Sequence, residues 1–531
     1  MTEPTRLLPS ELRRLSRPAG IVAAASVVLL ALSACWTGGF PGDPTAAPTP
    51  TNGGATASSG LARYYDQSVE WEDCGGGFEC AEVTAPMNWD DPEAGTDIEL
   101  AVVRQPATGD KIASLFLNPG GPGASGFDFV FDSVDFAVSA DLQERFDIVG
   151  WDPRGVGRSA PVTCYTDPKD MDDFLFGIPS SNPNTDPQGW IDEVTETGTA
   201  FGAACGENTG EVLQYIDTLS TVKDLDLLRA IVGDETLHYL GYSYGSDIGA
   251  YYAELFPENA GRIVLDGATD PSISVFEVGL EQTKGFQRAL ENYLVACPDL
   301  FADCPFTGDL AIDLPRIRAI YDALDASPVR GLDGRFMDAG VLDTAMSAAL
   351  YSQDSWEYLN ILFEQAEAGE TEMGFLLADF YYDRNPDGTY ATNMFEAFFA
   401  IYCVDYPVES DPAVLAEQEV LLQQASPTTY RAFPPAGDTV CANWPYQYLG
   451  DGDLSVTGAG APPVLIVATT GDPATPYEWG VRLAEAMESG VLVTYNGEGH
   501  TAYNKGSECV NRTVDDFFIN GTVPASDPNC S

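Results

Sequence analysis

Short runs of apolar residues recur along most of the chain, separated by polar segments of helical length. The first two runs are close together and predict an antiparallel pair, whereas the later runs alternate with helical patterns and predict parallel strands. The pattern therefore predicts a mixed, mostly parallel sheet of eight strands with helices on both faces. The predicted strands are Ala81–Met87, Asp97–Gln105, Ala113–Asn118, Phe146–Trp151, Leu237–Gly241, Arg262–Leu265, Val464–Ala468 and Gly490–Tyr495.

The alternation of strands and helices stops between the sixth and seventh predicted strands, where the sequence predicts mostly helices. We expect a large helical lid (271–461) inserted into one sheet domain, which is built from residues 63–270 and 462–531. Aromatic residues in this segment can form the core of the lid or line a substrate pocket. Examples of predicted helices and aromatic clusters are Phe276–Cys297, Ala339–Glu367, Phe380–Tyr382 and Phe395–Phe399.

The pentapeptide Gly241-Tyr242-Ser243-Tyr244-Gly245 follows the fifth predicted strand and precedes a helical pattern, Ser246–Phe256. A Gly-x-Ser-x-Gly between a strand and a helix is typical of a nucleophile elbow, in which a strained turn presents the serine. Small residues two positions away on each side let the turn close. The position predicts Ser243 as a nucleophile beneath the lid.

Two histidines, His238 and His500, are available as a general base for Ser243. His238 lies inside the strand that leads to the elbow, so we interpret it as structural. His500 lies on a loop after the last predicted strand, and Asp472 follows the seventh strand, where an acid that orients the histidine belongs. The order Ser243, Asp472, His500 is that of α/β-hydrolases. A plain Asp-Pro turn is the alternative for Asp472.

The third predicted strand runs into a loop rich in glycine and proline, residues 118–123. Glycines let backbone N–H groups approach a developing negative charge. We expect the N–H groups of Gly121 and of Tyr244, the residue after the nucleophile, to form an oxyanion hole; a plain surface loop is the alternative. Thr475 could brace the Asp472 carboxylate with its hydroxyl group or serve only as a turn residue.

Together these motifs resemble those of the secreted tripeptidyl aminopeptidases of actinobacteria, which belong with the proline iminopeptidase-like α/β-hydrolases. The resemblance matches Ser243 to the nucleophile, Asp472 to the acid, His500 to the base and Gly121 to the oxyanion glycine. Ser246 stands where the family usually has threonine and keeps the hydroxyl group. The resemblance spans roughly residues 64–530 and rests on the segments 118–123, 150–159, 241–245, 471–476 and 497–501.

The resemblance implies a serine exopeptidase that releases short peptides, chiefly tripeptides, from free N-termini, and we expect this protein to be a monomer that needs no cofactor. A carboxylesterase or lipase would use the same triad, and a non-catalytic lipoprotein that binds a surface ligand is a third hypothesis, which the complete triad argues against. Peptidase and esterase would differ in the lid, because a buried α-amine needs a carboxylate partner. The lid acids that we consider for this role are Glu277, Glu281 and Asp405.

The net charge and the cysteine content limit the partners and the cellular compartment that we expect for this protein. The formal net charge is −56, with acidic residues dispersed along the chain, so we exclude DNA or RNA as partners. Two histidines and the lack of a Cys-x-x-Cys pair argue against a metal site. Eleven cysteines leave ten when Cys35 is set aside, which suits five disulfides in an oxidising compartment. The expected pairs are Cys74–Cys80, Cys164–Cys205, Cys297–Cys304, Cys403–Cys441 and Cys509–Cys530.

The N-terminal segment has arginines followed by the apolar run Ile21–Leu32 and then Leu-Ser-Ala-Cys, which looks like a bacterial lipobox. We expect residues 1–34 to be a signal peptide, Cys35 to be lipidated, and residues 35–62 to be a flexible tether. The chain would then be held on the outer face of the cell membrane by this lipid alone. An ordinary cleaved signal, with secretion of the protein, is the alternative.

Anchoring can be tested with radiolabelled palmitate in a bacterial host. We expect label in the wild-type protein but not in Cys35→Ala, which should appear in the medium because it lacks the thiol that carries the lipid. Equal labelling of both proteins would remove the lipoprotein hypothesis.

Overall fold

The computed structural model describes residues 60–93, 96–431, 433–448, 450 and 455–531. All of these belong to one compact unit, Pro48–Ser531. The predicted signal peptide, Cys35 and the tether up to residue 59 lie outside the described residues. Among the described residues, no helix combines the length and the apolar character that a membrane span requires.

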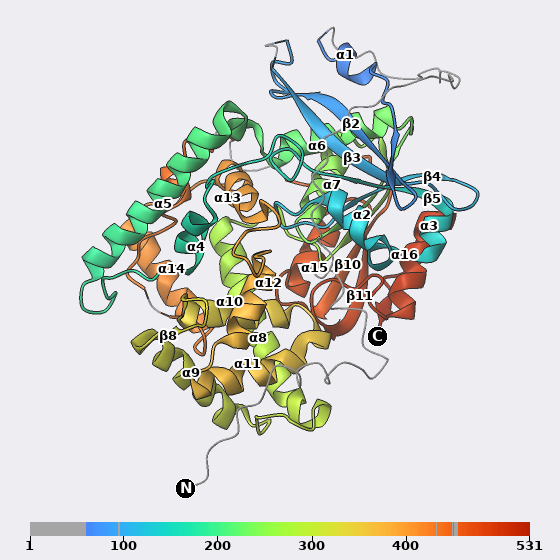
Figure 1. Cartoon of the computed structure of the whole chain (residues 1–531). Coiled ribbons are helices and arrows are strands. Elements are labelled where there is room, and N and C mark those ends of the chain that lie inside the picture. Colours follow the sequence, from blue (N-terminus) through green and yellow to red (C-terminus); the bar gives the residue numbers. More distant parts are fainter. Residues whose placement is uncertain (1–59, 94–95, 432, 449, 451–454) are drawn as a thin grey trace. The chain divides into compact units, whose positions relative to one another are not determined.

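A ten-stranded sheet contains all eight predicted strands and a short additional strand at each edge (Figure 1). Its strands are β1 (Glu72–Gly75), β2 (Phe78–Pro86), β3 (Asp97–Gln105), β4 (Ala113–Asn118), β5 (Phe146–Trp151), β6 (Leu237–Tyr242), β7 (Ala260–Asp266), β10 (Val464–Gly471), β11 (Gly490–Glu498) and β12 (Asn529–Cys530). Their order is β1-β2-β3-β5-β4-β6-β7-β10-β11-β12. The pairs β1–β2, β2–β3 and β3–β5 are antiparallel, and every pair after β5 in this order is parallel. The mostly parallel sheet of an α/β-hydrolase is therefore confirmed.

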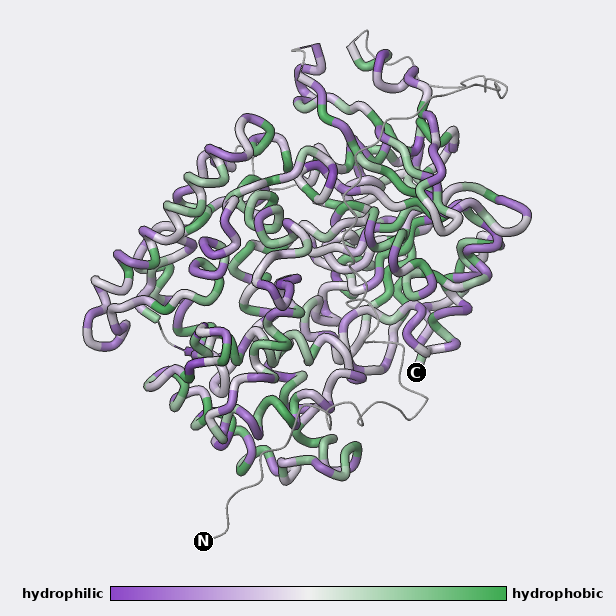
Figure 2. The backbone as a smooth tube through the Cα atoms, viewed as in Figure 1, coloured by the Kyte–Doolittle hydropathy of each residue, from purple (hydrophilic) through white to green (hydrophobic). Residues whose placement is uncertain are grey.

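Helices cover both faces of this sheet, because successive strand residues point to opposite sides. In β4, Phe116 packs into one hydrophobic cluster, and Leu115 and Leu117 pack into another. Figure 2 shows hydrophobic residues concentrated along the strands. The first cluster is closed by α1 (Ala62–Tyr65), α6 (Thr218–Ile231), α7 (Gly245–Leu255) and α15 (Tyr477–Ala486). The second is closed by α2 (Gly126–Ala137), α3 (Ala140–Arg145) and α16 (Glu508–Asn520).

A helical lid occupies the chain between β7 and β10. Its elements are α8 (Val275–Leu300), α9 (Leu310–Ala326), β8 (Val329–Arg330), β9 (Phe336–Met337), α10 (Ala339–Leu350), η3 (Gln353–Ser355), α11 (Trp356–Ala368), α12 (Glu372–Tyr381), α13 (Met394–Asp405), α14 (Pro412–Ala425) and η4 (Cys441–Asn443). The predicted continuous helix over Ala339–Glu367 is wrong, because the chain leaves the helix at Tyr351. The Ser352 side chain accepts a hydrogen bond from the Asp354 amide and caps the short η3 turn there.

A second helical segment, between β5 and β6, packs against the lid. It consists of α4 (Pro168–Phe176), α5 (Pro187–Thr209) and η2 (Gly210–Tyr215). Phe201 of α5 contacts the rings of Phe399 and Trp444 from the lid. The predicted boundaries place this segment within the sheet domain. The five disulfides of the structure are the five predicted pairs.

A fully buried ion pair joins Arg154, in the turn after β5, to Asp224 of α6. The guanidinium group donates to both carboxylate oxygens at 2.7 Å and also to the carbonyl oxygens of Pro86, Met87 and Tyr215. All of its donors are used inside the protein. Arg154 therefore braces loops and cannot contact a substrate.

We expect Arg154→Met to lower the free energy of unfolding by about 3–5 kcal/mol, because it leaves the Asp224 carboxylate buried without its cation. Urea denaturation measures this loss. The matched control is Lys223→Met, which removes a solvent-exposed pair with Asp90 and should cost less than about 1 kcal/mol. An equal loss in both variants would contradict the structural role of Arg154.

Candidate active site

Ser243 lies at the sharp turn between β6 and α7, with a left-handed backbone conformation (φ 54°). Its amide donates to the Asp266 carbonyl oxygen at 2.9 Å, and its carbonyl oxygen accepts from the Ser246 hydroxyl group at 2.6 Å. A Cβ atom on Gly241 would lie 2.2 Å from the Gly245 carbonyl oxygen, so the turn closes only with glycine there. These contacts hold a conformation that serine rarely adopts.

The carboxylate of Asp472, just past β10, is fully buried and accepts hydrogen bonds from several donors. The amides of Ala474 and Thr475 donate to Oδ1 at 2.9 Å each, and the Thr475 hydroxyl group donates to Oδ2 at 3.0 Å. The Thr501 amide and His500 Nδ1 lie 3.1 and 2.9 Å from Oδ2. Both oxygens of this carboxyl group therefore act as acceptors for donors on the surrounding loops. The expected contact between Thr475 and Asp472 is present.

His500 is held by Asp472 on one side of its ring and has a free nitrogen on the other. With Nδ1 donating to Asp472, the tautomer leaves Nε2 as an acceptor. Nε2 is buried and has no hydrogen-bond partner among the described residues. A Cβ atom on Gly267 would lie 3.1 Å from His500 Cε1, and Gly267 follows Asp266, whose carbonyl oxygen binds the Ser243 amide. The elbow and the imidazole are thus neighbours across Gly267.

The lid contacts the His500 loop directly at the break between α10 and α11. The His500 amide donates to the Tyr351 carbonyl oxygen at 2.8 Å, and the two rings meet edge to face at 5.4 Å. A Cβ atom on Gly499 would lie 3.0 Å from that carbonyl oxygen. The ring of Tyr381 packs against Tyr351 at 6.3 Å, so part of the predicted lid aromatic cluster extends to the site.

The loop over residues 118–123 lies against the elbow. A Cβ atom on Gly120 would lie 2.9 Å from Ser243 Cβ and 3.0 Å from the Tyr244 amide nitrogen. Within the part of the chain that is described, the amides of Gly121 and Tyr244 donate to no other group. Tyr244 directly follows the nucleophile, and Gly121 lies on the loop that packs against the elbow, so both predicted donors stay candidates for the oxyanion hole.

His238 is not part of this arrangement. Its Nδ1 accepts from the Arg262 amide at 3.0 Å, and its ring meets Phe146 edge to face. Burial, with a smaller effect from the Arg262 charge, lowers its pKa to about 4. A neutral imidazole that is held between residues of β5 and β7 is structural, as the sequence predicted.

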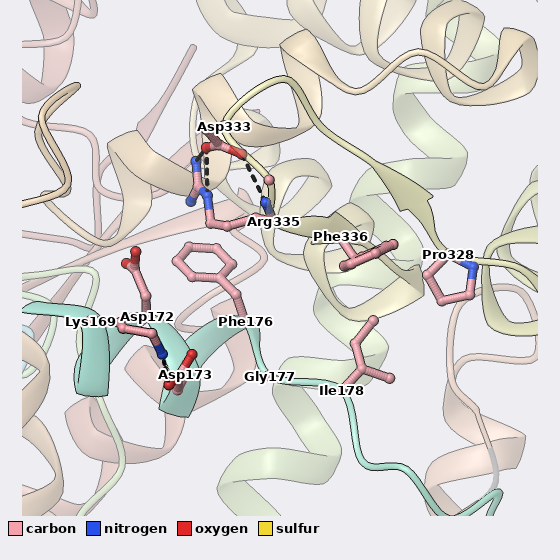
Figure 3. A pocket seen from close by; sticks show the side chains of 11 residues that line it. Lys169, Asp172, Asp173, Phe176, Gly177, Ile178, Pro328, Asp333, Arg335 and Phe336 are labelled. Carbon is pink, nitrogen blue, oxygen red and sulfur yellow. Dashed lines mark hydrogen bonds and ion pairs between the residues drawn. The ribbon is translucent and has the colours of Figure 1, made fainter.

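A groove of about 650 Å³ between α4 and the β8–β9 hairpin is lined by none of the predicted site residues (Figure 3). Its charged groups are all paired: Lys169 with Asp173, Arg335 with Asp333 at 2.7 Å, and Asp172 with Arg384, outside the groove, at 2.7 Å. We assign it no part in the chemistry. Among the described residues, no group of three or more His, Cys, Asp or Glu side chains is arranged to hold a metal ion.

The fold and the site define the class of protein as an α/β-hydrolase. A family model described as TAP-like protein matches residues 430–530. Serine protease Hip1 of Mycobacterium tuberculosis is 35% identical over 87% of this chain and 91% of its own length. Carboxylesterase B of the same species is 37% identical over 85% and 86%, and the tripeptidyl aminopeptidase of Streptomyces lividans is 29% identical over 90% and 89%. The chain belongs to the TAP-like family and is a serine hydrolase of that family.

We expect Ser243→Ala, His500→Ala and Asp472→Asn each to lower kcat by about 10³–10⁶-fold, since each removes one member of a unit that transfers a single proton. Circular dichroism should show an unchanged fold. His238→Gln is the matched control and should keep most of the activity. Near-normal turnover by His500→Ala would overturn the assignment.

Proposed function

We propose that this protein is an extracytoplasmic serine exopeptidase that releases short peptides, chiefly tripeptides, from free N-termini. His500 removes the proton of Ser243 as the hydroxyl oxygen attacks the scissile carbonyl carbon, and Asp472 stabilises the imidazolium ion that forms. The amides of Gly121 and Tyr244 donate to the oxyanion. His500 then protonates the leaving amine, and water hydrolyses the acyl-enzyme by the same steps.

The observation that carries the exopeptidase proposal is the carboxylate of Asp405, at the end of α13. The other two acids considered have partners of their own. Glu277 forms a capping box with Ser274 at the start of α8, and Glu281 accepts from Trp479 and Arg482. Asp405 instead accepts from the amide and the hydroxyl group of Thr218, at 3.0 and 2.5 Å.

Asp405 has the environment of an ammonium site. No Lys or Arg among the described residues forms an ion pair with it. Burial, and next the neighbouring carboxylate of Asp217, raise the pKa of Asp405 to about 8. Three tyrosines, Tyr244, Tyr251 and Tyr406, lie close enough to Asp405 for its charge to help raise the pKa of each phenol. A substrate ammonium group would supply the missing cation and contact aromatic faces at the same time.

The length of α13 supports a tripeptide as the released unit. The loop of the oxyanion hole meets the helix at Phe398, since a Cβ atom on Gly123 would lie 3.0 Å from the Phe398 amide nitrogen. Asp405 lies seven residues further along, which is about 10 Å at 1.5 Å per residue. Three residues of extended chain span about the same distance. A longer released peptide would carry its amine past Asp405.

A carboxylesterase remains the second candidate, because carboxylesterase B is as similar to this chain as the serine protease is. The two candidates share every residue of the triad and the oxyanion hole. They differ in whether Asp405 is used by the substrate.

The location outside the cytoplasm is part of the same proposal. Five disulfides support an oxidising compartment. The membrane would be contacted only through the lipid on Cys35, and the partners would be peptides with free N-termini rather than nucleic acid.

The test compares Ala-Pro-Ala-arylamide, its N-acetylated form and a p-nitrophenyl ester. Acetylation removes the ammonium charge, so we expect kcat/KM to fall at least about a hundredfold, close to 3 kcal/mol at 1.4 kcal/mol for each tenfold change. Equal cleavage of the free and acetylated peptides would favour the esterase.

Asp405→Asn should reduce this discrimination, because kcat/KM for the free peptide should fall more than kcat/KM for the acetylated peptide. Glu277→Gln, which alters a lid acid at a helix cap, is the matched control and should discriminate like wild type. If Asp405→Asn still prefers the free peptide a hundredfold, Asp405 does not bind the amine.

A further inference from the structure

Helix α13 is anchored to the sheet domain by polar contacts at its N-terminal end. The Asn393 side chain donates to the carbonyl oxygens of Gly155 and Val162 and accepts from the Gly157 amide, all at 2.9 Å. One turn later, Glu396 accepts from the amides of Cys164 and Tyr165 at 2.8 and 2.9 Å. The helix is therefore a fixed wall of the site.

Helix α13 contacts both segments that supply the predicted oxyanion hole, the loop over residues 118–123 and the turn that contains Tyr244. On one side, Gly123 lies so close to α13 that a Cβ atom there would be 2.3 Å from the Met394 carbonyl oxygen. On the other side, the ring of Tyr244 packs against a hydrophobic cluster formed by Ala397 and Ile401 of α13 and Val156 of the core.

The side chain of Tyr244 is also fixed at its far end. Its hydroxyl group lies 2.5 Å from the hydroxyl oxygen of Thr218, the first residue of α6. The same Thr218 oxygen donates to Asp405 Oδ2, and the Thr218 amide donates to Asp405 Oδ1. Thr218 therefore forms hydrogen bonds both to Asp405, the last residue of α13, and to Tyr244, the residue after the nucleophile.

The Thr218 hydroxyl group can form both of its hydrogen bonds at once. A hydroxyl group has one proton and can also accept, so Thr218 can donate to Asp405 Oδ2 and accept from the Tyr244 hydroxyl group at the same time. The Tyr244 side chain is then held by a continuous chain of two hydrogen bonds that ends on Asp405. Burial holds the phenol in its protonated form by raising its pKa far above the usual value.

We propose that Thr218 is a positioning residue of the oxyanion hole: it fixes Tyr244 so that the Tyr244 N–H group points at the developing oxyanion. The proposal rests on Ser243 as the nucleophile, which is part of the proposed function, but not on the recognition of an amine. Loss of one oxyanion donor costs about 10²–10³-fold in kcat, and a misaligned donor costs less. We expect about a ten- to hundredfold loss when Thr218 loses its hydroxyl group.

The test uses Thr218→Val, which keeps the shape and the amide but removes the hydroxyl group, and Thr218→Ser, which keeps the hydroxyl group. The substrate is p-nitrophenyl acetate, because it has no amine and reports on acyl transfer alone. Thr218→Val should lower kcat ten- to hundredfold with KM within about threefold of wild type. Thr218→Ser should stay within about threefold of wild type in both constants.

Tyr244→Phe provides a second variant should Thr218→Val fail to fold, and it should lower kcat on the ester in the same range. The double variant Thr218→Val/Tyr244→Phe should lose no more than the larger single loss, since both changes break one chain of bonds. If the loss in kcat of the double variant instead equals the product of the two single losses, the two side chains act independently, which would contradict the proposal.

Three results would overturn the positioning role of Thr218. They are a normal kcat of Thr218→Val on the ester, a loss confined to peptides with free amines, and a loss that Thr218→Ser does not rescue. A failure of the exopeptidase proposal looks different, since wild type would then cleave free and acetylated peptides equally while the ester results stand.

Discussion

The carboxylate of Asp472 is the group on which the geometry of the site depends. It is buried completely, so its charge must be balanced by donors inside the protein. Those donors come from the two loops that follow β10 and β11, which the carboxylate therefore ties together. The same contact orients His500 so that its free Nε2 faces away from Asp472. The strained turn at Ser243 can be used only because this base is already fixed beside it.

The lid completes the site as well as covering it. The carbonyl oxygen of Tyr351 holds the His500 amide, and α13 holds the two segments that carry Gly121 and Tyr244. In the proposed function, acyl transfer and recognition of the substrate amine share one helix, whose N-terminal half contacts the segments of the oxyanion hole and whose last residue is Asp405.

The sequence predicts those features whose signal is local. The elbow, the eight strands and the loops that carry Asp472 and His500 follow from short patterns, and neighbouring cysteines suggested the disulfides. The break at Tyr351 has only a weak local signal, since Ser352, Asp354 and Ser355 favour caps and turns, and its stabilising partner, the His500 amide, lies far along the chain. Thr218 gives no sequence signal beyond following the helix cap at Asp217. Its role emerges only when α6, α7 and α13 meet.

The most direct test of the account is the site of reaction with a fluorophosphonate probe, mapped by mass spectrometry of the labelled protein. The account predicts a single adduct on Ser243, formed quickly in wild type, far more slowly in His500→Ala, and absent in Ser243→Ala. An adduct on another residue, or labelling that persists in Ser243→Ala, would contradict the claim that this serine is the activated nucleophile.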